Sequence, residues 1–254
     1  MIIRKLADAI RQQNWFTVIL EILIVVIGLF IGLQLDDWNQ RRIDRATEAA
    51  YLQELLEDFE ANRASLENTS ERLETILRNM NALLGQSVMG KPDWTIAQLN
   101  DAFIRAQDMP AFIAVVRTYT NLTGSGDLRL IRNRELKNDL AQYFATSDLA
   151  VLIQNTHEME LVSTFQPYII KNLDYQAVYN QRLDDRPIAP PVEEERILDV
   201  LHTREFRNIL TQKHTISADV LEQHRRLLAM TDSIIRTLQA SINDGESAAT
   251  TQPK

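Results

Sequence analysis

Four histidines, His157, His202, His214 and His224, are the side chains of this sequence best suited to metal binding or proton transfer. They form no H-E-x-x-H motif and no pair four residues apart, the spacing that places two imidazoles on one helix face around zinc. The sequence also has no G-x-S-x-G nucleophile motif and no cysteine, which excludes thiol catalysis and thiolate metal sites. We therefore expect solvated or core histidines in a protein without catalytic activity, cofactor or bound metal.

One acidic residue, Glu21, interrupts the longest apolar segment of the chain, residues 15–35. Gly28 and Gly32 in the same segment form a G-x-x-x-G pair, the spacing that lets two helix backbones approach closely in lipid. At about 100° per residue, Glu21 and both glycines fall within about 20° of one line along the helix. Either this face is a helix–helix interface, or Glu21 snorkels and the glycines are merely common in membrane helices. We favour the interface, because an unpartnered carboxyl in lipid is costly.

Residues 15–35 predict an uncleaved transmembrane helix. At about 1.5 Å per residue the segment spans a hydrocarbon core of about 30 Å. A signal peptide would have a shorter apolar core followed by a small-residue cleavage site, and no such site follows residue 35. Trp15 and Trp38 bracket the span, where aromatic rings favour the headgroup layers. No other stretch is comparably apolar, so we expect a single-pass protein.

The orientation of this span is not decided by charge, because basic residues are equally frequent just before and just after it. The short, basic tail 1–14 would itself have to be translocated in one orientation, whereas large C-terminal domains cross a membrane largely regardless of charge. We therefore expect the tail in the cytoplasm of a bacterium, the span in its inner membrane, and the C-terminal domain in the periplasm.

The rest of the chain predicts an all-α fold. Gly and Pro number 7 each, too few for a β-sandwich, a barrel or a Rossmann-type sheet. The seam of a long first helix steps by four and three residues through Leu52, Leu56, Phe59, Arg63, Leu66, Ser70, Leu73, Leu77, Met80 and Leu84. This heptad spacing suits either a two-stranded coiled coil or an antiparallel bundle.

The expected extramembrane domain covers residues 36–242, and its first helix (40–84) continues the membrane helix. Helices are expected at 40–84, 94–106, 110–122, 128–146, 148–180 and 193–242. The last of these repeats the 3/4 spacing, with Lys213, Ser217, His224 and Thr231 as polar interruptions. It is the natural antiparallel partner of the first helix.

Several local signals mark the boundaries of these helices. Asp93 and Asn133 are candidate N-caps, and the two glycines of 123–127 predict a helix C-cap and turn rather than a phosphate-binding loop. The prolines of 180–191 predict a loop, and the small polar residues of 243–254 predict a disordered tail.

The anchor resembles an uncharacterised family of bacterial single-pass membrane proteins. The resemblance lies in residues 21–28, 31–35, 37–39, 51–52 and 122–133. The family pattern is similar to G-E-I-x-L-V-V-I-G-I-x-I-A-L-Q-I-N-N-W-N with a downstream S-G-x-L-x-L-I-x-N segment, and this sequence departs from it at Leu20, Gly32 and 36–37. Because the family has no established function, the resemblance implies topology only.

Together these features predict a membrane-anchored helical interaction module, which would be a sensor, a scaffold or an accessory subunit. Its expected partners are the lipid bilayer and a second copy or another membrane protein, contacted through the transmembrane helix. The net charge of −8 argues against nucleic acid as a partner. The alternative is a transport or energy-coupling accessory subunit that uses the intramembrane carboxyl of Glu21.

Overall fold

The structure is a computed structural model that describes residues 15–176 and 194–250. Within these ranges it contains helices and no strand, so the predicted all-α class is confirmed. The elements are α2 (Trp15–Val88), α3 (Ile96–Arg105), α4 (Arg117–Ser125), the 3₁₀ turn η1 (Asp127–Arg129), α5 (Arg134–Glu160), the π-helical turn η2 (Leu161–Phe165), α6 (Gln166–Asn172), α8 (Glu194–Leu201) and α9 (Arg204–Thr250). Contacts divide the chain into two units, Met1–Tyr51 and Leu52–Lys254.

The first unit contains the N-terminal part of α2. This helix is continuous from Trp15 to Val88, as the sequence predicted, and it runs four residues further than the expected end at Leu84. Among the described residues it is the one helix long and apolar enough to cross a membrane. The expected tail 1–14 lies outside the described residues.

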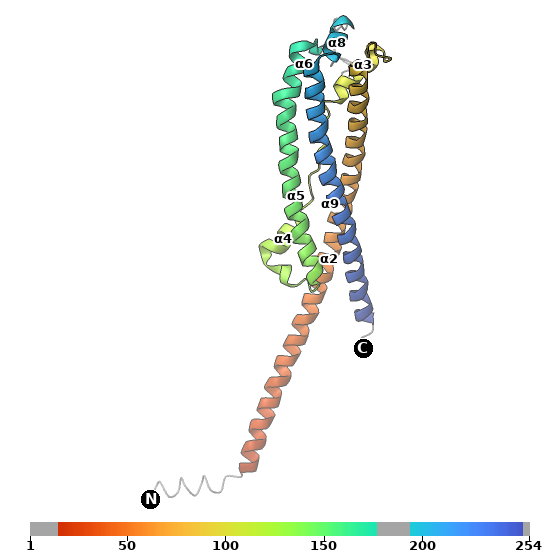
Figure 1. Cartoon of the computed structure of the whole chain (residues 1–254). Coiled ribbons are helices and arrows are strands. Elements are labelled where there is room, and N and C mark those ends of the chain that lie inside the picture. The colour runs from red at the N-terminus through yellow and green to blue at the C-terminus, as the bar shows by residue number, and fades with distance from the viewer. Residues whose placement is uncertain (1–14, 177–193, 251–254) are drawn as a thin grey trace, which may run out of the picture. The chain divides into compact units, whose positions relative to one another are not determined.

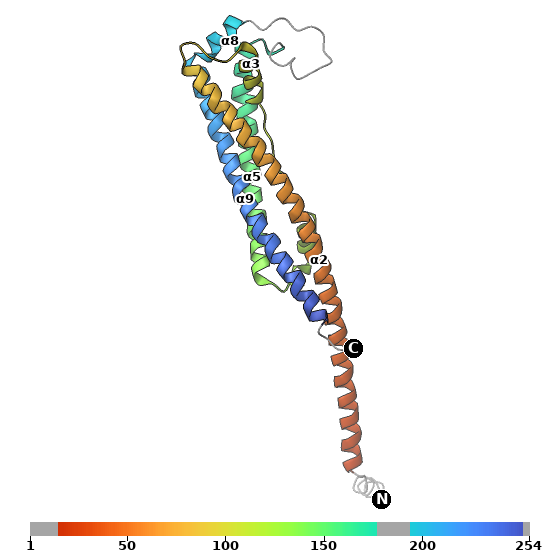
Figure 2. The same cartoon turned by 90° about the vertical axis from the view of Figure 1, so that its right-hand side faces the viewer.

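The second unit is a bundle of three long helices, in which residues 52–88 of α2 lie beside α5 and α9 (Figures 1 and 2). Arg225 of α9 contacts Glu74 of α2, and Arg207, earlier in α9, reaches Ser87, later in α2. α9 is therefore antiparallel to α2, which is the pairing expected for the first and last long helices. α5 runs parallel to α2, and its first-turn cap Asn133 contacts Ser241 near the end of α9.

An extended segment, residues 108–116, returns the chain along the bundle so that α5 can run parallel to α2. The predicted helix 110–122 is wrong over this stretch, and α4 begins only at Arg117. Side-chain amides of α2 and α5 hydrogen-bond to the backbone of Val115 and Phe112. These bonds compete with helical hydrogen bonds, and the β-branched residues nearby favour extended backbone.

The expected helices 128–146 and 148–180 are one helical run rather than two. α5 continues to Glu160, η2 follows, and α6 ends at Asn172. Pro167 does not break this run. Proline cannot donate a hydrogen bond to the carbonyl four residues earlier, and the backbone accommodates it with the π-helical turn directly before α6. The expected loop 180–191 lies outside the described residues.

The expected helix 193–242 is in fact two helices. α8 ends at Leu201 and α9 begins at Arg204, where the Thr203 hydroxyl accepts a hydrogen bond from the Phe206 N–H at 3.1 Å, as an N-cap does. α9 extends past Ile242 to Thr250, so the prediction of a disordered tail is wrong for 243–250, and 251–254 lie outside the described residues.

Two of the three predicted helix ends are confirmed. Gly126 adopts the left-handed conformation (φ 79°) at the end of α4, and the Asn133 side chain accepts from the Leu136 N–H at 3.1 Å. The N-cap of α3 is Thr95 rather than Asp93. Thr95 forms a reciprocal capping box with Gln98, which satisfies two otherwise unpaired N–H groups.

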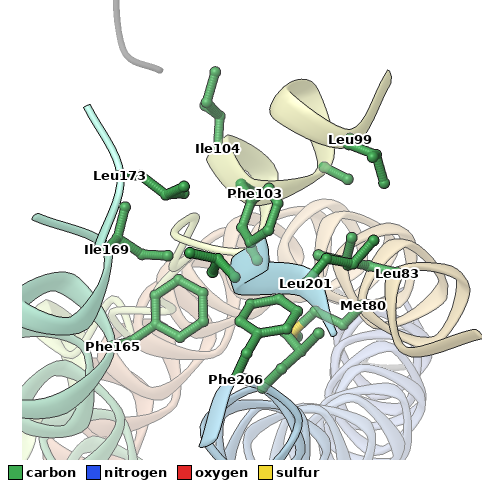
Figure 3. Close-up of a cluster of buried hydrophobic side chains, with 14 of the residues drawn as sticks. Met80, Leu83, Leu99, Phe103, Ile104, Phe165, Ile169, Leu173, Leu201 and Phe206 are labelled. Carbon is green, nitrogen blue, oxygen red and sulfur yellow. The ribbon is translucent and has the colours of Figure 1, made fainter. Parts of the chain in front are cut away.

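The apolar core is densest at one end of the bundle, where α3, α6 and α8 meet the ends of α2 and α9 (Figure 3). Phe103 and Phe206 pack with their ring centroids 5.0 Å apart, and Phe165, Met80 and Leu83 surround them. Burial of such side chains contributes roughly 1.5–3 kcal/mol each to folding, so this cluster holds the short helices onto the long ones.

The buried seam of α2 is shifted by one residue from the predicted one at several positions. Leu55, Asn62, Ile76 and Leu83 are buried, while Arg63 is exposed. The predicted seam residues Leu56, Leu77 and Leu84 are half-buried instead. Asn62 takes the inner position because its amide binds the extended segment.

Candidate functional site

The apolar face of α2 includes the residues that the sequence singled out. From Ile19 to Leu35 the large apolar side chains are all more than two-fifths exposed, and a Cβ added at Gly28 or Gly32 meets nothing within 4 Å. Both glycines therefore leave an open strip on one helix face that a second helix can approach. Their role in an interface remains a prediction.

Three more residues were predicted for the membrane helix, Trp15, Glu21 and Trp38, and of these the structure describes the side chain of Trp38. Trp38 is 59% exposed, and the Arg42 guanidinium lies 5.9 Å from the centre of its ring, a favourable cation–π geometry. Trp15 and Glu21 belong to α2, but their side chains lie outside the described residues. Backbone position still places Glu21 two helical turns before Gly28, on the same face.

A second group of candidate residues forms a polar ladder inside the bundle, between α5 and α9. The α9 members are the predicted interruptions Lys213, Ser217, His224 and Thr231, and all four are fully buried. Their partners on α5 are Glu160, His157, Gln154 and Tyr143. The sequence had singled out His157 among the four histidines, but it did not identify the other three or any of the pairings. The available signal was their spacing, because Tyr143, Gln154 and His157 continue the 3/4 phase of the apolar residues Leu136 and Leu140. Glu160 follows His157 by three residues and falls outside that phase.

The first rung of the ladder is an ion pair. Lys213 Nζ lies 3.6 Å from Glu160 Oε2, and the two side chains are 0% and 3% exposed. Burial raises the pKa of the Glu160 carboxyl, and the attraction of Lys213 partly opposes that shift. Burial also lowers the pKa of Lys213 to about 8, against the effect of Glu160. Glu160 is the last residue before the π-helical turn η2, a distortion common at functional sites.

The next rungs pair both core histidines with polar side chains. His157 Nε2 lies 3.2 Å from the Ser217 hydroxyl, and burial together with Lys213 lowers the pKa of His157 to about 3. His224 Nε2 lies 3.0 Å from Gln154 Oε1, and burial lowers the pKa of His224 to about 4. Both imidazoles are therefore neutral in the folded protein at neutral pH. Because a carboxamide oxygen only accepts, Nε2 of His224 carries the proton.

The last rung places the Tyr143 phenol of α5 near Thr231 of α9 in the buried core. Burial raises the pKa of the Tyr143 phenol to about 12, and Thr231 lowers it by a smaller amount. The Tyr143 ring also packs on Phe59 of α2, with the centroids 4.8 Å apart. This rung therefore connects all three long helices.

Two amide side chains, one from the ladder and one from α2, hold the extended segment 108–116. Gln154 accepts from the Phe112 N–H at 2.7 Å and donates to the Phe112 carbonyl at 3.0 Å. Asn62 of α2 binds Val115 in the same two-bond manner, at 2.7 and 3.2 Å. We call Asn62 and Gln154 the amide clamp. The clamp holds the irregular segment 108–116 against α2 and α5.

Asp58 extends the clamp to the start of α4. Its carboxylate accepts from the Thr118 N–H at 3.0 Å and from the Arg117 guanidinium at 2.9 Å. A carboxylate at this position satisfies an N–H that the helix leaves unpaired and favours the positive end of the helix dipole.

Shallow hollows on the surface of the described residues include one of about 260 Å³ between α5 and α9. It is lined by Ile153, Thr156, Ile216, Asp219, Glu222 and Gln223. Another, of about 230 Å³, lies between α2 and the end of α3. The ladder residues line neither hollow, and the described residues contain no group of three or more His, Asp or Glu side chains able to hold a metal ion.

Comparison of the chain with protein-family models, with curated proteins and with solved structures finds no match in any of the three.

Proposed function

We propose that the chain is a membrane-anchored helical interaction module, acting as a sensor, scaffold or accessory subunit. The observation that carries the proposal is the continuity of α2, which has a span-sized apolar stretch near its start and helps to build the bundle core near its end. An exposed apolar surface of that length is unfavourable in water and favourable in a hydrocarbon core.

The proposed location is the inner membrane of a bacterium, with one span, the N-terminus in the cytoplasm and the bundle in the periplasm. The short basic tail supports this orientation, because the opposite orientation would require the tail itself to be translocated. The resemblance of the anchor to a family of bacterial single-pass proteins supports the same topology.

The proposal assigns the polar core to positioning rather than to catalysis. The ladder side chains contact one another across α5 and α9, and Gln154 and Asn62 bind backbone groups. Such contacts fix the register of the helices and the path of segment 108–116. The outer surfaces of the module are then the parts available for a partner, whether a second copy or another membrane protein.

The alternative function is a transport or energy-coupling subunit, which the position of Glu21 on the glycine face supports. That role needs a carboxyl that gains and loses a proton, whereas an interface needs only a hydrogen-bonding group. Glu21→Gln separates the two, because the amide keeps the hydrogen bond and cannot ionise.

Extraction of membranes at high pH tests the anchor. The full chain should stay in the membrane pellet, and a Val25→Arg/Leu29→Arg variant should be found in the supernatant, since two guanidinium groups in the span oppose insertion. A Val25→Leu/Leu29→Val variant is the matched control and should stay in the pellet. Release of the unaltered chain from the membrane would contradict the proposal.

A further inference from the structure

Directly after the predicted span, the basic residues of α2 lie on one side of the helix. Trp38, Arg41, Arg42 and Arg45 all belong to the first unit of the chain and are exposed. At about 100° per residue they lie within about 100° of one another around the helix, and we call these four residues the basic stripe. Among the residues that the structure describes, Arg41 and Arg45 have no hydrogen bond or ion pair. Both guanidinium groups can therefore bind an anionic partner.

The acidic residues of the same segment lie on a different side of the helix. Asp36, Asp37 and Asp44 are as numerous as the arginines of residues 36–45, but the middle of the acidic group is about 140° from the middle of the basic stripe. The Gln40 side chain donates to the Asp44 carboxylate at 2.8 Å. The helix therefore presents one basic and one acidic side, although the segment as a whole is neutral.

The basic stripe reaches back toward the predicted span. Side chains of an α-helix lean toward its N-terminus, and Arg42 shows this lean. Its guanidinium lies 5.9 Å from the centre of the Trp38 ring, one turn earlier, and donates to the Asn39 side chain at 3.3 Å. Residue 38 is about 4.5 Å along the helix axis from the predicted end of the span at residue 35. Because the headgroup layer is about 5–8 Å deep, the guanidinium of Arg42 lies at its level.

The side of the helix that is predicted to pair with a second helix leaves the basic stripe uncovered. Gly28 and Gly32 face about 110° around the helix from the middle of the stripe. Two copies that pair through these glycines would therefore keep the stripe directed toward lipid.

We infer that the basic stripe binds the phosphate groups of anionic phospholipids at the membrane surface. Guanidinium groups donate paired hydrogen bonds to phosphate oxygens and stack on aromatic rings, and clustered basic residues next to a span attract anionic lipids. The inference rests on the proposed function, because the stripe meets lipid only if residues 15–35 span a bilayer. Lipid bound on one side of the helix would fix its rotation about its own axis, and with it the direction of the glycine face.

The lipid preference of the full chain in phosphatidylcholine vesicles tests the inference. Each sample contains a trace of spin-labelled phosphatidylglycerol or spin-labelled phosphatidylcholine, and electron paramagnetic resonance measures the fraction of label immobilised beside the protein. The natural chain should hold phosphatidylglycerol at least about threefold more strongly than phosphatidylcholine, because each arginine near a membrane surface attracts anionic lipid. Raising the salt from about 0.1 M to about 1 M should remove most of this preference, since charges are then screened within about 3 Å.

Removal of the three positive charges should abolish the preference. Arg41→Gln/Arg42→Gln/Arg45→Gln should hold the two lipids about equally. The variant with Lys at the same three positions should retain most of the preference, because it keeps the charge and loses only the paired hydrogen bonds of the guanidinium group.

Arg72→Gln/Arg226→Gln/Arg236→Gln is the matched control. It removes the same charge from exposed positions of the bundle helices α2 and α9, and it should keep the preference of the natural chain. Loss of the preference in this control would show that the net charge of the chain attracts the lipid, and would overturn the inference.

Equal affinity of the natural chain for the two lipids would also overturn the inference, as would an unchanged preference in the Gln variant of the stripe. Inorganic phosphate should lower the preference no more than chloride does at the same ionic strength. A preference removed by phosphate alone would make the stripe a site for free anions rather than for lipid.

The acidic side of a second copy's helix is the competing partner for the stripe. Binding there would make the Gln variant of the stripe associate less with a second copy in pure phosphatidylcholine vesicles, without a lipid preference in the natural chain, and would overturn the inference. None of these results affects the anchor. Retention in the pellet at high pH measures the anchor on the same variants, so a retained chain without a lipid preference contradicts only the binding of anionic lipid.

Discussion

Lys213 of α9 and Glu160 of α5 form an ion pair across 3.6 Å in the interior of the bundle, with both side chains almost completely buried. Removing water from two charges costs several kcal/mol per ion, and the attraction between them offsets this only if the pair stays intact. The pair is therefore expected to select one alignment of α5 against α9, at the point where η2 distorts the helix.

Breaking this ion pair should cost much more stability than breaking an exposed one. Lys213→Met leaves the Glu160 carboxyl buried without a partner and should lower the free energy of unfolding of the fragment 52–250 by about 3–5 kcal/mol, whereas Lys213→Met/Glu160→Met should recover most of it. Arg225→Met is the control, because the exposed Arg225–Glu74 pair contributes about 1 kcal/mol or less. Urea unfolding followed by circular dichroism measures all three, and equal losses for Lys213→Met and Arg225→Met would contradict the assignment.

Acid should destabilise the bundle through His157 and His224. Burial lowers their pKa values to about 3 and about 4, from 6.5 in the unfolded chain. Below pH 6.5 the unfolded chain binds protons that the folded chain does not, so stability falls as the pH decreases toward 4. Each histidine should contribute a loss of about 2 kcal/mol between pH 7.5 and pH 5.

Urea unfolding at these two pH values checks this prediction. His157→Gln and His224→Gln should each show a smaller loss than the unaltered fragment, because glutamine keeps a hydrogen-bonding group but does not titrate. The same pH dependence in all three proteins would show that these imidazoles do not titrate as their burial indicates.

The amide clamp should control the order of segment 108–116. Asn62→Ala removes both hydrogen bonds to Val115, and Gln154→Ala removes both to Phe112. Each change should lower the protection of the corresponding backbone N–H against hydrogen exchange, by about 1–3 kcal/mol. Asn68→Ala, at an exposed position of the same α2 helix, should leave the exchange unaltered. Unchanged protection of Val115 in Asn62→Ala would mean that another group holds the segment.

Bulk on the glycine face of the membrane helix should weaken self-association of that helix. Gly28→Leu/Gly32→Leu should reduce the signal of a membrane two-hybrid assay, and Val26→Leu, about 160° around from Gly28, should not. Because nothing in the described part of the chain lies within 4 Å of a Cβ at either glycine, the loss would come from a partner helix.

Changes at Glu21 should follow a definite order in the same assay. Glu21→Gln should keep most of the association, and Glu21→Leu should lose on the order of 1 kcal/mol. If neither the glycine changes nor Glu21→Leu alters association, the shared face has no role in packing. If Glu21→Gln abolishes a cellular phenotype while association is intact, the energy-coupling alternative is supported.

The fold was largely predictable from the sequence because its main determinants are local. Alternating 3/4 spacing identified the long helices, and the polar interruptions from Lys213 to Thr231 were placed correctly on the inner side of α9. The end of α4 followed from Gly126 and the start of α5 from Asn133, each a signal that acts within a few residues.

The predictions that were wrong or incomplete share a different cause: in each, the residue contacts a partner that is far away in the sequence. Residues 110–116 have a pattern compatible with a helix, but Asn62 and Gln154, both more than 40 residues distant, bind their backbone instead. Asn62 displaced Arg63 from the seam for the same reason. Glu160 was missed as a site residue, and the pairing of His157 with Ser217 was not predicted, because the partners Lys213 and Ser217 lie on another helix. The short cap at Thr203, which separates α8 from α9, was overlooked among stronger helix signals.

The central claim is that one N-terminal span anchors the chain and carries the bundle across the membrane. A pair of reporters fused after Ile242, one active only in the periplasm and one active only in the cytoplasm, tests it most directly. The account predicts activity of the periplasmic reporter and none of the cytoplasmic one. Activity of the cytoplasmic reporter alone would contradict the account and place the bundle inside the cell.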